Sequence, residues 1–242
     1  MKEKIKKYLK EHQIEDKVSL FYHKPSTNET YLYREDVMML AASTIKVPVV
    51  MAWTDLIDKG VASWDTLLQY HERHYEESDD KALYDRYSYG DFVPLSECME
   101  LAVVYSDNPS NHMMREYYHQ YAGLTFREWF AQFSKRELQE EFYQRNVMNA
   151  EIMLEVMKRL YSNSDRYQKL ISDMKRAASG RYIQANHFDF EVAQKYGEYD
   201  RYEHTMAILY QRDPVLVGVF TELAGEAAKR TIADLSKIMA EG

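Results

Sequence analysis

The chain has 242 residues, with 31 Lys and Arg against 39 Asp and Glu, and a formal net charge of −8 at pH 7. This acidic balance disfavours a nucleic-acid partner, which would need a basic surface to meet phosphates. With 45% hydrophobic and 29% charged residues, and only 8 Gly and 5 Pro, the chain is typical of a globular protein with a substantial core rather than a disordered or linker-rich one.

Several other kinds of structure are not expected. A single cysteine, Cys98, excludes an intrachain disulfide and a cysteine-cluster metal site. His71 and His74 have the spacing of metal ligands, but no third ligand accompanies them. The basic N-terminus lacks a secretory signal, and the apolar run Val47–Trp53 is too short to span a bilayer. The sequence as it stands predicts a cytoplasmic protein, or an exported one if a signal was removed, and leaves the oligomeric state open.

The first quarter of the chain predicts a helix, a hairpin and a longer helix. Ile5, Tyr8 and Leu9 recur at helical spacing, whereas residues 18–23 alternate in the manner of a strand. The turn cluster at 25–28 then leads into the expected partner strand. The predicted elements are a helix around residues 5–9, strands at 18–23 and 29–34, and an apolar helix from about Thr44 to Lys59.

The rest of the chain predicts a helical middle followed by strands. A polar stretch at residues 71–92 is interpreted as a long surface loop with at most one short helix. Apolar stripes predict helices at 95–105, from Pro109 to 117, at 152–160 and at 170–178. Strand periodicity returns at Phe188–Val192, Met206–Tyr210 and Val215–Phe220, and a helix at 228–239 closes the chain.

These elements predict an α/β (α+β) architecture with two subdomains in a single domain, 1–242. The strands near both chain ends form one five-stranded antiparallel sheet, flanked by the two terminal helices. We expect the sheet subdomain to comprise residues 1–42 and 181–242. The inserted all-helical subdomain then spans 43–180, with a cleft where the two meet.

Ser43-Thr44-Ile45-Lys46 is an S-x-x-K motif at the start of a predicted helix. Residues three apart on a helix share a face, so the Lys46 amine is expected to reach the Ser43 hydroxyl. A lysine activates a serine only when it is desolvated or close to another cation. Lowering a lysine pKa from about 10.4 to about 7.5 takes roughly 4 kcal/mol. The apolar flanks favour such burial, although the motif alone is weak, because it recurs at Ser172–Lys175 with no other sign of chemistry.

Two further motifs follow along the chain. Ser106-Asp107-Asn108 stands between two predicted helices, where Ser106 would pass protons and Asn108 would bind an amide. Ser, Asp and Asn are also the usual helix-capping residues, so a structural loop is an equally simple explanation. Lys195-Tyr196-Gly197 lies on a predicted strand, where glycine permits close approach of a substrate and Lys195 offers a cation. An ordinary strand end would have the same sequence.

The order S-x-x-K, S-D-N, K-x-G, on a helix, a loop and a strand, resembles the class A β-lactamase and penicillin-binding-protein superfamily. The resemblance covers nearly the whole chain, and the neighbourhoods Ala42–Pro48 and Tyr105–Asn111 are similar to those of the family's motifs. It implies a β-lactamase-like fold with two subdomains. It also implies a bacterial serine hydrolase of β-lactam catabolism or antibiotic resistance, acting on a small molecule without a cofactor or metal.

The resemblance also implies the catalytic roles. Ser43 is then the nucleophile that accepts the acyl group, and Lys46 serves as its general base or assists it. Ser106 relays a proton toward the leaving nitrogen. Lys195 binds the substrate carboxylate and helps keep Lys46 neutral.

The same resemblance implies the substrate-binding residues. Asn108 hydrogen-bonds the substrate's side-chain amide, and Gly197 belongs to the strand that borders the substrate. The oxyanion hole consists of the backbone N–H groups of Ser43 and Glu198, donors of a kind commonly worth about 3–4 kcal/mol each in a transition state. The third motif is usually K-T-G or K-S-G. Tyr196 replaces its hydroxyl residue, so binding of ordinary β-lactams depends on where the phenol points.

A second departure concerns hydrolysis of the acyl-enzyme. Class A enzymes use a Glu in an E-x-x-L-N loop between the second and third motifs, and no such sequence occurs here. Glu137, Glu140 and Glu141 are the candidates in that region. The stretch reaches the next helix too quickly for a full-length loop, which favours an ordinary acidic helix face. Without a positioned base, water attack is slow, because general-base catalysis contributes about 10²–10⁴-fold.

Three functions remain open on this basis. The leading one is a class A β-lactamase-like hydrolase, acylated at Ser43 by a β-lactam or related amide and then hydrolysed. The first alternative is a penicillin-binding, peptidase-like or esterase-like enzyme with slow deacylation, favoured by the missing loop Glu. The second is a catalytically weak binding protein on the same fold, suggested by Tyr196.

Overall fold

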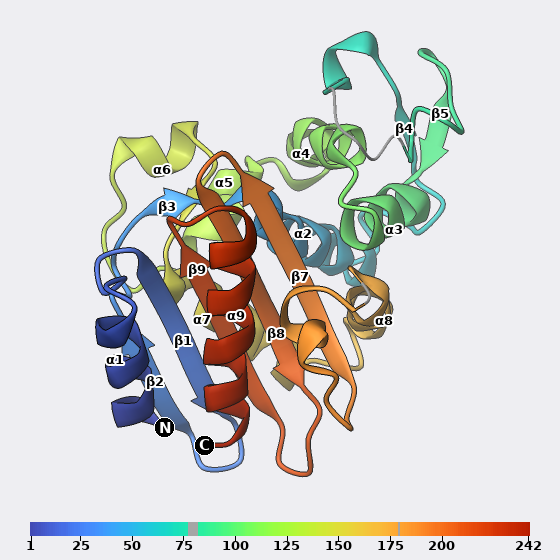
Figure 1. The fold of residues 1–242 in the computed structure, drawn as a ribbon. Coiled ribbons are helices and arrows are strands. Elements are labelled where there is room, and N and C mark those ends of the chain that lie inside the picture. Colours follow the sequence, from blue (N-terminus) through green and yellow to red (C-terminus); the bar gives the residue numbers. More distant parts are fainter. Residues whose placement is uncertain (77–81, 179) are drawn as a thin grey trace. The chain divides into compact units, whose positions relative to one another are not determined.

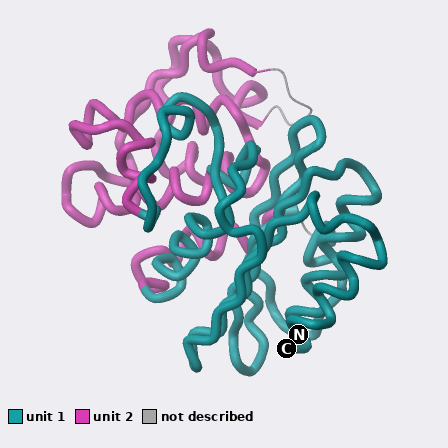
Figure 2. The backbone as a smooth tube through the Cα atoms, turned by 90° about the vertical axis from the view of Figure 1, so that its left-hand side faces the viewer, with its two compact units in different colours: residues 1–45, 133–162, 178–242 teal, residues 46–132, 163–177 magenta. Residues whose placement is uncertain are grey.

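The computed structural model describes residues 1–76, 82–178 and 180–242, which separate into two compact units (Figure 2). Unit 1 contains Met1–Ile45, Phe133–Ser162 and Ala178–Gly242, and unit 2 contains Lys46–Gln132 and Asn163–Ala177. This division differs from the expected subdomains, because residues 133–162 belong with the sheet rather than with the inserted helices.

The core of unit 1 is a five-stranded antiparallel sheet with the order β2-β1-β9-β8-β7 (Figure 1). The prediction of one such sheet built from both chain ends is therefore confirmed. Strand β7 forms one edge and pairs only with β8 in this sheet, with Lys195 opposite Met206 and Gly197 opposite His204. The strands are β1 (Val18–Lys24), β2 (Glu29–Tyr33), β7 (Val192–Tyr199), β8 (Tyr202–Leu209) and β9 (Val215–Thr221).

Both faces of the sheet are covered by helices. Alternation along β1 directs Leu20 into the apolar cluster formed with α1 (Lys2–Glu11) and α9 (Gly225–Ala240), which lie in front of the sheet in Figure 1. The neighbouring Phe21 points to the opposite face, where α7 (Ala150–Ser162) packs on β1 and β9. The flanking terminal helices agree with prediction. The apolar stripe of α7 explains why its segment belongs to unit 1.

Short elements complete unit 1. Strand β3 (Met39–Leu40) pairs with β6 (Val147–Met148) and leads into the 3-10 turn η1 (Ala42–Ile45). The other elements are α6 (Glu140–Gln144) and the 3-10 helix η3 (Tyr182–Asn186). The strand predicted from Phe188 begins only at Val192. Phe188 and Phe190 instead stack on each other, with ring centroids 4.7 Å apart, against the apolar cluster of the sheet.

Unit 2 is mainly helical and is organised around α2, whose residues from Lys46 to Leu56 are buried. Its helices are α2 (Lys46–Asp58), α3 (Leu95–Val104), α4 (Asn108–Ala122), α5 (Phe126–Ala131) and α8 (Gln168–Arg176). The predicted loop at 71–92 contains the short helix η2 (Glu72–His74), and its residues 77–81 lie outside the described part. The small antiparallel pair β4 (Leu67–Gln69) and β5 (Phe92–Pro94) was not predicted, because three-residue strands show no periodicity.

Two further findings concern the described residues. None of their helices combines the length and apolar character that a membrane span requires. Within the same residues, no group of three or more His, Cys, Asp or Glu side chains is placed to hold a metal ion. His74 is buried and hydrogen-bonds Glu116. Cys98 is buried too, and burial raises the pKa of its thiol.

Candidate active site

In unit 1, Ser43 lies half-buried in the turn η1, which hydrogen bonds hold on both sides. The Ala41 N–H donates to the Asn146 carbonyl at 2.7 Å, and the Asn146 side-chain amide donates to the Ala42 carbonyl at 3.2 Å. Within the turn, the Thr44 hydroxyl donates to the Ala41 carbonyl at 2.6 Å. A segment about one hundred positions away thus fixes the backbone that carries Ser43. Sequence reasoning missed Asn146, since a single Asn carries no pattern.

Strand β7 passes directly against this turn. A Cβ atom at Gly197 would lie 2.6 Å from the Ser43 nitrogen, 2.9 Å from the Thr44 nitrogen and 3.0 Å from the Ala42 Cβ. No side chain fits there, so glycine is required by close approach of two backbones. The expectation that Gly197 admits a substrate to the strand stays a prediction, and the structure shows a second reason for glycine at this position. It brings the edge strand β7 against the Ser43 turn.

The contact between Gly197 and the Ser43 turn lies next to the two backbone groups that are expected to form the oxyanion hole. One proposed donor is the Ser43 N–H, and the other is the N–H of Glu198, the residue after Gly197. Because β7 is an edge strand, part of its backbone N–H groups are not used by the sheet. The Glu198 side chain is exposed and lies 3.6 Å from the Arg181 guanidinium.

A buried histidine supports the same turn from β8. His204 is fully buried, and its Nε2 donates to the Leu40 carbonyl at 2.7 Å, three residues before Ser43. Its Nδ1 accepts the Thr221 N–H at 3.0 Å, so one ring nitrogen donates and the other accepts, as in a neutral imidazole. Burial lowers the pKa of His204 to about 4. No sequence motif pointed to this residue.

In unit 2, Lys46 begins α2 and is almost fully buried, at 1% exposure. Its ammonium nitrogen donates to the Ser106 carbonyl at 2.5 Å, the Ser106 hydroxyl at 3.2 Å and the Asn108 side-chain oxygen at 2.6 Å. The structure therefore brings the second residue of the S-x-x-K motif together with two residues of the S-D-N motif.

The middle residue of S-D-N has a structural role. Asp107 is buried and caps α4, because its carboxylate accepts the Ser110 N–H at 2.8 Å and the Ser110 hydroxyl at 2.6 Å. It also accepts the Leu83 N–H at 3.1 Å. Ser106 has φ of 59°, so the chain turns sharply before the cap. The capping interpretation thus applies to Asp107, which fixes the loop that presents Ser106 and Asn108 to Lys46, while the chemical roles of Ser106 and Asn108 stay predictions.

On β7, the side chains of the third motif form a stack of rings and cations. The Lys195 ammonium lies 4.0 Å from the centroid of the Tyr196 ring, and Lys195 is fully buried. Tyr196 stacks on Tyr182 at 4.9 Å, and both rings belong to the apolar cluster of unit 1. The Arg181 guanidinium lies over both rings, at 5.3 and 5.6 Å. The ring of Tyr196 is thus a packing element in the apolar cluster.

The profile of a β-lactamase enzyme family matches residues 1–241. The chain belongs to that family. No curated protein sequence matches it at a significant level.

Several solved structures share the fold. A class A β-lactamase described as the last common ancestor of Gram-negative bacteria has a TM-score of 0.81 and 18% identity, with 99% of this chain and 97% of that chain covered. A class A β-lactamase from Mycobacterium abscessus gives 0.77 and 18%, over 93% and 92%. The protein PBP-A gives 0.79 and 14%, over 93% and 88%. At these identities the likeness establishes the fold.

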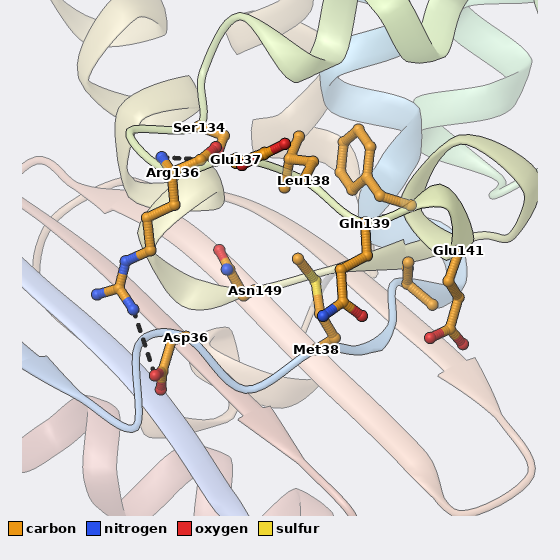
Figure 3. Close-up of a pocket in the computed structure, with 11 residues that line it drawn as sticks. Asp36, Met38, Ser134, Arg136, Glu137, Leu138, Gln139, Glu141 and Asn149 are labelled. Atoms are coloured by element: carbon orange, nitrogen blue, oxygen red, sulfur yellow. Dashed lines mark hydrogen bonds and ion pairs between the residues drawn. The ribbon is translucent and has the colours of Figure 1, made fainter.

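The three candidate glutamates lie in the segment that contains α6 and leads to β6. Glu137 and Glu141 line a pocket of about 210 Å³ in unit 1 (Figure 3). Glu140 accepts a hydrogen bond from Gln144 at 2.6 Å, and Glu141 pairs with Arg145. All three glutamates are exposed. Glu140 and Glu141 lie on α6 and fit the predicted acidic helix face, whereas Glu137 precedes that helix.

Proposed function

We propose that this member of the β-lactamase family is a serine acyl hydrolase, acylated at Ser43 by a β-lactam or a related amide. The observation that carries the proposal is the environment of Lys46, a buried amine held by Ser106 and Asn108. Ser43 precedes Lys46 by three positions in a helical stretch, a spacing that favours contact between the two side chains. The same pattern on a solvated surface would lack any means of activating a hydroxyl.

In the proposed acylation, the Ser43 oxygen attacks the amide carbonyl carbon while its proton passes to Lys46. The negative charge that develops on the carbonyl oxygen meets the N–H groups of Ser43 and Glu198. The tetrahedral intermediate then collapses with cleavage of the C–N bond. The leaving nitrogen receives the proton through Ser106, which leaves an ester on Ser43 and a neutral Lys46. As the resemblance implies, Lys195 holds the substrate carboxylate and helps keep the amine of Lys46 neutral.

Release of the product needs a water molecule to attack the Ser43 ester. A positioned carboxylate would speed this step by about 10²–10⁴-fold. Glu137, Glu140 and Glu141 are exposed, so none of them has the enclosed, fixed position that a general base needs. We infer that hydrolysis is slower than acylation, so that the ester accumulates.

This expectation favours a second candidate function, an enzyme of the penicillin-binding, peptidase or esterase type with a long-lived acyl intermediate. PBP-A, one of the similar structures, has a mutant captured as an acyl-enzyme complex with penicillin G. The Tyr at position 196, in place of the usual hydroxyl residue, is the feature of this chain that would shift its preference away from ordinary β-lactams. An ester or a different amide is then the better acyl donor.

One pair of assays separates the candidates. The protein and its Ser43→Ala variant are incubated with a fluorescent penicillin, a chromogenic cephalosporin and a simple activated ester, and intact mass is followed over time. Steady turnover that depends on Ser43 supports a β-lactamase, and a persistent Ser43-dependent adduct supports the slow enzyme. If no donor gives a Ser43-dependent adduct, the chemistry proposed here is wrong and the binding-protein hypothesis remains.

A further inference from the structure

The pocket that Glu137 and Glu141 line in unit 1 contains none of the residues assigned to acylation. It has a volume of about 210 Å³ and lies between Asp36 and Met38, which precede β3, and the segment 134–149 around α6 (Figure 3). A cavity of about 150 Å³ is large enough to hold a benzene molecule. The pocket therefore has room for a small organic molecule.

Part of the pocket surface is apolar and open to solvent. Met38 is a large apolar residue, yet it is 39% exposed. Leu138 is only partly buried, and Phe142 and Val147 line the same space. Because removal of apolar surface from water is favourable, a bound molecule with an apolar side chain is stabilised here.

A buried side-chain amide provides a hydrogen-bond donor. Asn149 is 4% exposed, and its side-chain oxygen accepts the Ile152 N–H at 2.9 Å, which caps the start of α7. In the part of the chain that the structure describes, no group accepts a hydrogen bond from the side-chain nitrogen of Asn149. Figure 3 shows this side chain among those that line the pocket. A buried N–H group without an acceptor is costly, so an oxygen atom of a bound molecule fits beside it.

The basic residue of the pocket is already balanced by acidic neighbours. The Arg136 guanidinium contacts three carboxylates, at 3.3, 3.3 and 3.6 Å, from Asp36, Glu151 and Glu35. One positive charge thus meets three negative charges. The surplus around Arg136 is negative, which disfavours an anionic ligand.

Glu137 is the carboxylate of the pocket that remains available. Among the described residues it forms no hydrogen bond and no ion pair, and it is exposed where it lines the pocket. Glu141, by contrast, pairs with Arg145. Since hydrogen bonds between oppositely charged groups are the strong ones, Glu137 favours a ligand with a cationic N–H group.

We propose that this pocket binds an α-amino amide, which combines an ammonium group, a carbonyl oxygen and an apolar side chain. The ammonium group pairs with Glu137, the carbonyl oxygen accepts from the side-chain nitrogen of Asn149, and the apolar side chain covers Met38 and Leu138. A free amino-acid amide and the amino end of a peptide share this chemistry. Binding at this site does not depend on the acyl chemistry proposed above.

Leucinamide is the first ligand to test, and two-dimensional ¹⁵N NMR spectra of the folded chain follow its binding. We expect the side-chain NH₂ signals of Asn149 to shift and to saturate. Asn149→Ser identifies these signals by their loss, and its hydroxyl still caps α7. N-acetyl-leucinamide lacks the ammonium group and glycinamide lacks the apolar side chain. Each should bind about fivefold more weakly, or weaker still.

Leucyl-glycinamide distinguishes the two sources of the ligand. If it binds as tightly as leucinamide, the site accepts the amino end of a peptide. If it binds much more weakly, the site is closed to a longer chain and takes a free amino-acid amide.

A pair of variants tests the role of the free carboxylate. Glu137→Gln should weaken leucinamide binding by about fivefold or more and leave N-acetyl-leucinamide unchanged. The matched control is Glu140→Gln, an exposed glutamate of the same segment that accepts from Gln144 and is not among the lining residues. It should bind leucinamide normally.

Three results would overturn the proposal. The first is leucinamide that shifts no signal of Asn149. The second is N-acetyl-leucinamide that binds as tightly as leucinamide. The third is an equal loss of binding in Glu137→Gln and Glu140→Gln, which would show only a general effect of charge.

Discussion

The chain contains the S-x-x-K pattern twice, and the two copies have opposite surroundings. At Ser43–Lys46 the serine lies in a turn packed against a sheet strand, and the lysine is buried among oxygen acceptors. At Ser172–Lys175 the serine is exposed on α8 and the lysine is half-exposed. The buried side chains of that second copy are Met174 and Asp173, and Asp173 pairs with Arg176 at 2.6 Å.

The S-x-x-K spacing alone does not make a serine nucleophilic. Both motifs place a hydroxyl and an amine three positions apart in helical structure. Only the first withdraws the amine from water and surrounds it with Ser106 and Asn108, from a loop about sixty residues away. A lysine in water holds its proton too firmly to serve as a base near neutral pH. We therefore expect acylation at the serine whose partner lysine is buried, which is Ser43.

The largest contrast is expected between the two lysines. Lys46→Ala should slow acylation by about 10²–10⁴-fold, because the general base of the reaction is lost. Lys175→Ala should leave the acylation rate unchanged. Both rates come from stopped-flow traces with a fluorescent penicillin or the best acyl donor found. Equal rates in the two variants would show that the first copy has no special chemistry.

A smaller effect on acylation is expected from a change in β7, the strand that packs against the S-x-x-K motif at Ser43. Gly197→Ala adds a methyl group 2.6 Å from the Ser43 nitrogen, and such overpacking costs about 1–3 kcal/mol. We expect lower stability together with slower acylation, since the Ser43 turn must move. Gly60→Ala is the control, because Gly60 has φ of 69° with open space around it. It should lose stability to backbone strain and keep its acylation rate. Normal acylation by Gly197→Ala would contradict the role of the strand.

His204, which supports the Ser43 turn, predicts that the stability of the fold depends on pH. The folded pKa of His204 is about 4, below its ordinary 6.5, so the unfolded chain takes up the proton first as the pH falls. Its contribution to stability is complete above about pH 6.5 and is lost toward pH 4, by roughly 2 kcal/mol at about pH 5.

Denaturant unfolding of the wild type and His204→Gln at about pH 5 and pH 7.5 measures this effect. The wild type should lose more stability than the variant between the two pH values. His23 and His74, whose pKa values burial also lowers, are present in both proteins and cancel. Equal losses would mean that His204 does not titrate as the structure indicates.

The smallest effect is expected at the acidic segment of unit 1. Glu137→Gln, Glu140→Gln and Glu141→Gln should each leave the rate of ester hydrolysis unchanged within about twofold. A true general base would contribute about 10²–10⁴-fold. The loss of an intact-mass adduct over time gives these rates directly. A large drop in one variant would identify the missing base and overturn the assignment of this segment as an ordinary helix face.

Sequence periodicity predicted the helices and strands that show a local pattern of apolar residues. The alternation at residues 18–23 and the apolar stripe of α7 were clear in the sequence and form the expected elements. The stripe did not reveal that α7 packs on the sheet, because a stripe does not name its partner. Asn146 and His204 escaped notice for a related reason. Each acts through hydrogen bonds to a segment more than one hundred residues away, and isolated long-range contacts leave no periodic pattern in the sequence.

The most direct test of the central claim is to locate the acyl group on the chain. The protein is treated with a reactive penicillin or activated ester, digested, and its peptides are sequenced by mass spectrometry. The account predicts the added mass on the peptide that contains Ser43, and its absence from the peptide that contains Ser172. An adduct on Ser172, or on neither serine with any donor, would contradict the account.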